Sequence, residues 1–205
     1  IASNHDGSLS KAKELIQMCA EAGSNAAKFQ NFTSETLICD KAFSKIGNVA
    51  HQSAWKESTF EGYNKVSVPL DWTEDLKNEC KKNNIDYFTS PYRLDFIDKL
   101  NQYVSAWKVG SGDITFHESI EKMAKTNKTV IIATGASEIS EVAEVINLVL
   151  KLNENIILMQ CNTNYTGSLD NFRHINLNVL KTYSKLFPNI ILGLSDHTPG
   201  HSTVL

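Results

Sequence analysis

The sequence has no excess of basic residues and no long apolar run. Its 205 residues include 20 Lys and Arg against 23 Asp and Glu, which gives a formal net charge of -3. That balance argues against nucleic acid or an anionic membrane surface as a partner. No apolar run reaches the roughly 18 residues that a membrane-spanning helix needs. No signal peptide is visible in these residues, but the chain opens without a methionine, so a removed N-terminal segment is one explanation of its start.

Cysteine is also scarce, and its spacing excludes two common uses. The four cysteines, Cys19, Cys39, Cys80 and Cys161, form no C-x-x-C pair and have no zinc-site spacing. Cys19 and Cys161 lie in apolar segments, which predicts buried thiols. A reducing, cytoplasmic setting fits this pattern best.

Short β-type runs alternate with amphipathic helical stretches along the chain, and 41% of the residues are hydrophobic. The expected helices cover residues 9–22, 71–83, 94–100, 117–125, 139–152 and 171–186. The expected strands cover residues 25–29, 85–89, 106–109, 129–133, 155–159 and 190–194, with Ile1-Ala2 as the stub of a first strand. Such alternation predicts parallel strands joined by right-handed crossovers.

The placement of polar residues favours a barrel over an open sheet. Nearly every expected strand ends in a polar or glycine-containing cluster, and a barrel brings all its strand ends to one face. An open sheet brings together only two or three. We therefore predict one α/β domain over residues 1–205, a (β/α)₈ TIM barrel that is incomplete, with about seven strands present and the eighth missing. Residues 31–68 lack a regular pattern and either cover the mouth of the site or form an ordered surface excursion.

The segment Trp107-Lys-Val-Gly-Ser-Gly-Asp113 indicates anion binding. Lys108 could neutralise a phosphate or carboxylate, while the glycines let backbone N–H groups approach it and Ser111 adds a hydroxyl donor. The alternative is a tight turn with Lys108 in solvent. Lys28 and Lys108 could also be Schiff-base lysines.

The segment Gly193-Leu-Ser-Asp-His-Thr198 places a histidine after a strand. A neutral imidazole at His197 could bind a divalent metal, or it could simply hydrogen-bond within the loop. After another strand, Asn162, Asn164 and Tyr165 could bind the hydroxyl groups of a polar substrate or simply end the strand.

Taken together, these segments resemble the N-acetylneuraminate (sialic acid) synthase family along essentially the whole chain. The motifs occur in family order: Ser3-Asn-His-Asp-Gly7, Ala26-Ala-Lys-Phe-Gln30, Val68-Pro-Leu-Asp-Trp-Thr73, Tyr87-Phe-Thr-Ser-Pro-Tyr92, Ala106-Trp-Lys-Val-Gly-Ser-Gly-Asp113, Ala133-Thr-Gly-Ala-Ser137, Leu158-Met-Gln-Cys-Asn-Thr-Asn-Tyr165 and Gly193-Leu-Ser-Asp-His197. Each motif alone is weak, but the ordered set is specific.

The resemblance implies a reaction and a set of roles. Phosphoenolpyruvate (PEP) condenses with an open-chain N-acetylated amino sugar, such as N-acetylmannosamine or a diacetamido sugar, to give a nonulosonic acid and phosphate. A divalent metal, Mn²⁺ or Mg²⁺, polarises the sugar aldehyde. The resemblance assigns Lys108 and His197 as catalytic, with His197 also a metal ligand. It assigns the PEP phosphate to Lys108, Ser111, Thr134 and Ser195, and the sugar to Gln30, Asp113 and Tyr165.

At four positions the chain departs from the family pattern. Asp113, Thr163 and Gln160 stand where glutamate, asparagine and histidine are usual. Ala133 stands where a serine is usual, so that Thr134 would substitute for it. The resemblance also implies parts outside the 205 residues: a glutamate before Ile1, and an eighth strand carrying a second metal histidine after Leu205. A C-terminal antifreeze-like domain would follow, and the full-length protein would be a cytoplasmic homodimer.

Two other functions remain open from the residues alone. One is a Schiff-base aldolase or lyase on a TIM barrel, which would use Lys28 or Lys108. The other is a non-catalytic relative that binds sugar phosphates without turnover.

Overall fold

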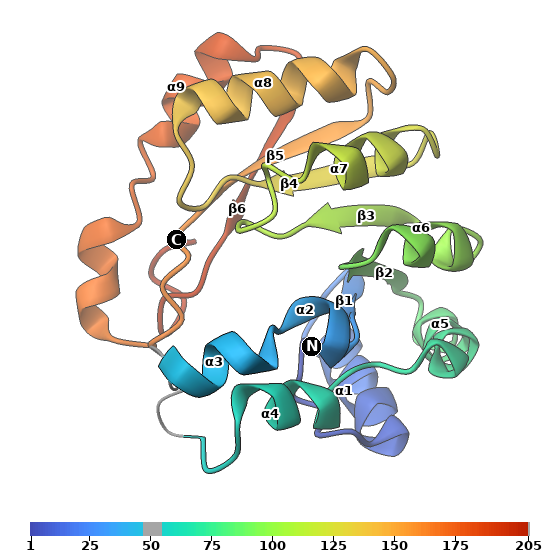
Figure 1. Cartoon of the computed structure of the whole chain (residues 1–205). Helices are drawn as coiled ribbons and strands as arrows, with labels where there is room; N and C mark the ends of the chain where they lie inside the picture. Colours follow the sequence, from blue (N-terminus) through green and yellow to red (C-terminus); the bar gives the residue numbers. More distant parts are fainter. Residues whose placement is uncertain (47–54, 205) are drawn as a thin grey trace. The chain divides into compact units, whose positions relative to one another are not determined.

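The computed structural model describes residues 1–46 and 55–204 (Figure 1). The chain groups into two compact units, Ile1–Trp107 and Lys108–Leu205, here called unit 1 and unit 2. Strand β3 (Ala106–Val109) crosses the boundary between them. No helix in the described ranges is long and apolar enough to cross a membrane.

Unit 1 alternates helices with parallel strands. Its elements are α1 (Leu9–Glu21), β1 (Ala26–Asn31), α2 (Ser34–Leu37), α3 (Asp40–Ile46), α4 (Thr59–Lys65), the 3₁₀ helix η2 (Leu70–Trp72), α5 (Thr73–Lys82), β2 (Asp86–Pro91), α6 (Leu94–Leu100) and the start of β3. Strand β1 pairs in parallel with β2 over six residues, and β2 pairs with β3 at Thr89 and Trp107. The side chains of Phe29 on β1 and Trp107 on β3 are fully buried.

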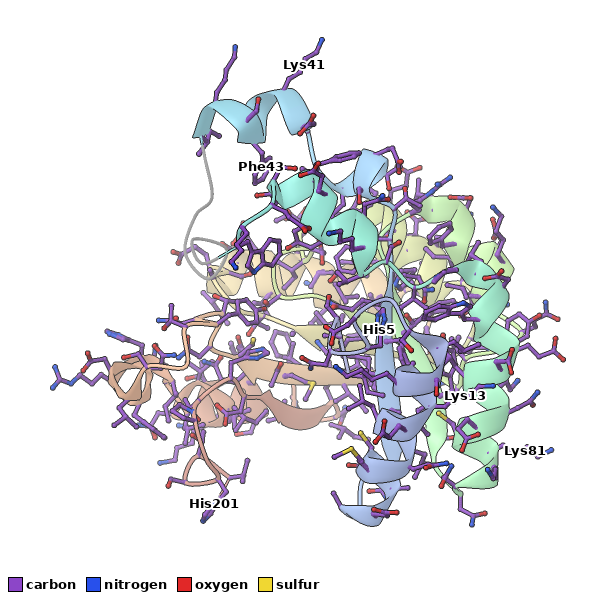
Figure 2. All side chains as sticks on the ribbon, turned by 90° about the horizontal axis from the view of Figure 1, so that it is seen from below. His5, Lys13, Lys41, Phe43, Lys81 and His201 are labelled. Carbon is purple, nitrogen blue, oxygen red and sulfur yellow. The ribbon has the colours of Figure 1, made fainter. Side chains whose placement is uncertain are left out.

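Helices α1 and α5 pack together in unit 1, held in register by polar contacts along their edges. Lys13 lies 2.5 Å from Asp75, and the Gln17 amide donates to Glu79 at 3.0 Å. Figure 2 shows Lys13 on α1 and Lys81 extending outward from α5. An exposed ion pair such as Lys13–Asp75 contributes little energy, so the buried apolar faces of the two helices provide most of the stability of their packing.

Two predictions for unit 1 were wrong. Ile1-Ala2 is not a strand, because Ala2 has a left-handed φ of 49° and the Asn4 N–H closes a turn onto the Ile1 carbonyl. The described residues therefore contain six strands rather than seven. The 31–68 segment is more regular than expected, since it contains α2, α3 and α4; residues 47–54 lie outside the described residues.

Unit 2 follows the same alternation. After the end of β3 come α7 (His117–Ala124), β4 (Thr129–Ala133), α8 (Ile139–Leu150), β5 (Ile156–Cys161), the 3₁₀ helix η3 (Leu169–His174), α9 (Val179–Leu186) and β6 (Ile191–Ser195). Strand β5 pairs in parallel with β4 on one side and β6 on the other. Helix α8 contributes fully buried Val142, Val145, Ile146 and Val149, the i, i+3, i+4, i+7 spacing of one helical face.

The predicted α/β alternation with parallel strands is confirmed, and most expected and observed elements differ by a few residues at their ends. The exception is the helix expected over 171–186, where the structure has the 3₁₀ helix η3 followed by the shorter α9 (Val179–Leu186). The barrel closure and the single domain over 1–205 stay predictions. Of the two thiols predicted to be buried, Cys161 is buried and Cys19 only half-buried. Cys80 is buried as well, and its surroundings raise the pKa of its thiol to about 12.

Candidate functional site

The end of strand β3 and the loop that follows it carry three of the predicted site residues. Gly110 and Gly112 make a tight turn in which the Asp113 N–H donates to the Gly110 carbonyl at 3.0 Å. Lys108 and Ser111 are each 9% exposed, and the Lys108 Nζ donates to the Val109 carbonyl at 2.9 Å. Burial raises the pKa of the Asp113 carboxyl, while the Lys108 charge opposes that shift. A cation and an acid therefore influence each other at this strand end.

The turn after β4 brings two other loops close together. Gly135 has a φ of +46°, and a Cβ there would lie 2.4 Å from the Ser111 Cβ and 2.6 Å from the Thr163 Cγ2. Only glycine allows this approach, so the β4 turn fixes the spacing of Ser111 and Thr163. The neighbouring Thr134 is 1% exposed, and its hydroxyl donates to the Met159 carbonyl at 3.2 Å.

Amide side chains organise the segment after β5. The Asn162 carboxamide donates to the Asn171 carbonyl at 3.2 Å, and the buried Asn171 carboxamide donates to the Asn164 carbonyl at 3.3 Å. The Asn164 side chain accepts from both the N–H and the hydroxyl of Thr166. These bonds fix the backbone on both sides of Tyr165, which is 52% exposed.

The segment after β6 holds Ser195 and His197. Ser195 ends the strand opposite Cys161 of β5. The Asp196 carboxylate accepts from the Thr198 N–H at 3.0 Å, a turn that brackets His197. The His197 ring packs edge-on against the Tyr165 ring, with centroids 4.4 Å apart. Two residues predicted from separate motifs are therefore neighbours.

A pocket of about 450 Å³ opens among the segments that follow β3, β4 and β5. Its lining residues are Ser111, Gly112, Thr115, Ala136, Ser137, Glu141, Thr163 and Tyr165. The carboxyl ends of parallel strands are where α/β proteins bind ligands. Of the predicted site residues, the structure brings Ser111 and Tyr165 into this pocket. Its lining does not include Lys108, Asp113, Thr134, Ser195 or His197.

Unit 1 holds the remaining predicted side chains. The Gln30 carboxamide on β1 donates to the Tyr92 hydroxyl at 3.0 Å. Lys28, also on β1, is half-buried, and burial lowers the pKa of its ammonium group. His5 lies in the loop before α1 (Figure 2), where its buried ring accepts from the Gly7 N–H at 3.1 Å and contacts the Trp72 ring. Burial lowers the pKa of His5, so a neutral imidazole tethers this loop.

A metal ion fits only incompletely among these residues. No group of three or more His, Cys, Asp and Glu side chains within residues 1–46 and 55–204 could hold an ion. His197 is a suitable donor by chemistry, but it has no such set around it in the described chain. The predicted divalent metal stays a prediction.

Sequence reasoning missed Glu141 and Thr115 as lining residues. Glu141 lies in the first turn of α8, where its carboxylate accepts from the Glu138 N–H at 2.8 Å and forms a capping box. Acidic residues are common in the first turn of a helix because they cap it, so the identity of Glu141 alone does not indicate a site residue. Its position could have indicated one, because a helix that begins a few residues after the end of a strand begins beside the site.

Comparison with known proteins supports the resemblance. The chain is 33% identical over 201 residues to the N,N'-diacetyllegionaminic acid synthase of Campylobacter jejuni, covering 96% of this chain and 59% of that protein. It is 31% identical over 204 residues to the human N-acetylneuraminate-9-phosphate synthase, covering 98% and 55% respectively. The chain thus spans somewhat more than half the length of these curated relatives.

A solved structure agrees with this relationship. The N-acetylneuraminic acid (sialic acid) synthetase of Leptospira borgpetersenii, crystallised with citrate, superposes with a TM-score of 0.80 at 25% identity, covering 98% of this chain and 65% of that one. The family model for NeuB matches residues 15–205, which is most of the sequence. The chain therefore belongs to the NeuB family.

Proposed function

We propose that the chain forms part of an enzyme that condenses PEP with an open-chain N-acetylated amino sugar. One observation carries this proposal: Ser111, assigned to the PEP phosphate, and Tyr165, assigned to the sugar, lie in one pocket of a NeuB-family chain. The proposed substrates would place a phosphate ester and a polyhydroxylated chain side by side. A pocket lined by hydroxyl groups suits such ligands.

The proposed reaction joins two substrates and consumes one water. Carbon 3 of PEP forms a bond to the sugar aldehyde carbon, whose oxygen takes up a proton and becomes a hydroxyl. Water adds to carbon 2 of PEP, the bond from carbon 2 to the phosphate oxygen breaks, and phosphate leaves. Carbon 2 is then the ketone of a nine-carbon acid, with three carbons from PEP and six from the sugar.

In this proposal the residues of unit 2 bind and position the anionic substrate. Lys108 would neutralise charge on PEP, and Ser111, Thr134 and Ser195 would donate hydrogen bonds to its phosphate. Tyr165 and Asp113 would bind the sugar, and the assignment of Gln30 to the sugar also stays a proposal. His197 would be one ligand of Mn²⁺ or Mg²⁺, but because the described residues form no complete metal site, we assign no step to the ion.

The test is phosphate release by the full-length protein, supplied with manganese. Release from PEP is expected only when N-acetylmannosamine or a 2,4-diacetamido sugar is also present. Lys108→Gln should raise the KM for PEP about tenfold or more, the loss expected for a charge-assisted hydrogen bond. Lys151→Gln on an exposed position after α8 is the control and should leave KM unchanged. No release with any of these sugars would overturn the proposal.

A second candidate is a Schiff-base aldolase or lyase, favoured by the lowered pKa of Lys28. Schiff-base chemistry needs an amine that is neutral near physiological pH, which burial promotes. Treatment with borohydride in the presence of pyruvate separates the two functions. A covalent adduct that disappears in Lys28→Arg would support the aldolase, whereas PEP-dependent phosphate release without any adduct would support the condensation.

A further inference from the structure

The hydrogen bond between Gln30 and Tyr92 joins the carboxyl ends of two neighbouring strands in unit 1. Gln30 is the penultimate residue of β1, and Tyr92 directly follows Pro91, where β2 ends. The Gln30 carboxamide donates to the Tyr92 hydroxyl at 3.0 Å, and both side chains are half-buried. Water therefore competes less for this bond than for one on an open surface.

Backbone and aromatic contacts hold Tyr92 in place beside Gln30. The Tyr92 N–H donates to the Asn31 carbonyl at 2.9 Å, which extends the pairing of β1 with β2 past the end of the strand. The Tyr92 ring meets the buried Phe32 ring edge-on, with centroids 6.2 Å apart and planes at 85°. Phe32 in turn packs edge-on against Tyr63 of α4, with centroids 5.5 Å apart. The hydroxyl that Gln30 contacts is therefore carried by a ring whose place is set by its neighbours.

A carboxamide has two chemically different ends, and Tyr92 is bonded to one of them. The NH₂ group donates, the oxygen accepts, and rotation about the last side-chain torsion exchanges their places at little cost. Among the described residues, the Tyr92 hydroxyl is the hydrogen-bond partner of the Gln30 side chain, and it holds the NH₂ group. The carboxamide oxygen is then left to accept from a hydroxyl or an N-acetyl N–H of a sugar.

We propose that Tyr92 is a positioning residue for sugar binding, which orients Gln30 so that its carboxamide oxygen accepts from the sugar. This inference rests on the proposed function, in which Gln30 binds the amino sugar. Without the phenol hydroxyl, the carboxamide also turns its NH₂ group toward the sugar, and the binding energy then includes the cost of ordering it. PEP binding is unaffected, because the residues assigned to PEP all belong to unit 2.

Tyr92→Phe in the full-length enzyme is the informative variant, because it removes the hydroxyl and keeps the ring against Phe32. Phosphate release gives kcat/KM for N-acetylmannosamine or a 2,4-diacetamido sugar at saturating PEP. This value should fall about threefold to tenfold, the loss expected for one neutral hydrogen bond, while kcat/KM for PEP stays unchanged. Tyr103→Phe is the matched control, since it removes a phenol hydroxyl from the turn between α6 and β3, at the amino ends of the strands. It should change neither value.

A double-mutant cycle separates positioning from a general effect on the fold. In a Gln30→Met background the carboxamide is gone, so Tyr92→Phe should lower kcat/KM for the sugar no further. An equal fall in both backgrounds, equal losses for sugar and PEP, or no fall at all would each overturn the role of Tyr92 while the condensation stands. If neither sugar supports phosphate release by the wild type, the proposed function fails, and the role of Tyr92 fails with it.

Discussion

At the scale of single residues, Asp113 shows how a site position affects stability. Its pKa is raised in the folded protein, because burial disfavours the ionised carboxylate more than Lys108 favours it. A carboxyl whose folded pKa is raised stabilises the fold below its unfolded pKa, and that contribution is lost as the pH rises through the folded pKa. Near pH 7, the ionised Asp113 should therefore destabilise the fold.

Asp113→Asn should accordingly raise the thermal unfolding midpoint near pH 7. The gain should shrink as the pH falls toward about 4, because the wild-type carboxyl then becomes protonated and neutral. Calorimetry across that range measures the difference. Asp170→Asn, at a side chain that is 79% exposed, is the control and should shift the midpoint little at any pH. A gain from Asp113→Asn that grows in acid would contradict the raised pKa.

Residue identity predicted part of the site and missed another part. The glycine-rich segment around Ser111 and the polar strand end at Tyr165 could be picked out from the sequence, because glycine and hydroxyl residues directly after a strand suit ligand binding as well as a turn. Glu141 could not be predicted as a pocket residue, because helix capping explains an acidic residue in a first helical turn equally well. Tyr165 follows β5 and His197 follows β6, so the contact between their rings joins two separate segments. The residue spacing within either segment could not predict this contact.

At the scale of elements, the buried Asn153 ties two helix-to-strand connections together in unit 2. Its carboxamide donates to the Ala124 carbonyl at 3.3 Å and to the Lys128 carbonyl at 2.7 Å. Its oxygen accepts from the Asn155 N–H at 2.8 Å. The link therefore joins the end of α7 and the start of β4 to the turn between α8 and β5.

Asn153→Ala should lower the free energy of unfolding by about 1–3 kcal/mol, because it leaves buried backbone groups without partners. Urea denaturation followed by far-UV circular dichroism measures this loss. Asn147→Ala, on an exposed position of α8, should change the free energy by less than about 0.5 kcal/mol. Equal effects in the two variants would show that the three bonds of Asn153 contribute nothing.

The elements that sequence reasoning recovered are the long ones. Helix α8 spans 12 residues and shows its apolar face through three turns, so its periodicity alone identifies it. Helices α2 and α3 have 4 and 7 residues. They are too short for a helical repeat of apolar residues to be recognised within the irregular sequence of residues 31–68. Ile1-Ala2 failed for a different reason: two apolar residues suit a strand, but the left-handed φ of Ala2 is set by the turn that follows.

At the scale of the whole molecule, each unit should depend on its own buried core. Leu76 of α5 and Leu158 of β5 are both fully buried, the first in unit 1 and the second in unit 2. Truncating a buried leucine removes apolar contacts and leaves a cavity that the surroundings fill only in part.

Leu76→Ala and Leu158→Ala should each lower the free energy of unfolding by about 2–5 kcal/mol in urea denaturation. Leu169→Ala is the control, because that side chain is 75% exposed and should change stability by less than about 0.5 kcal/mol. If truncating either buried leucine changed the free energy of unfolding as little as truncating Leu169, the core assigned to that unit would be wrong.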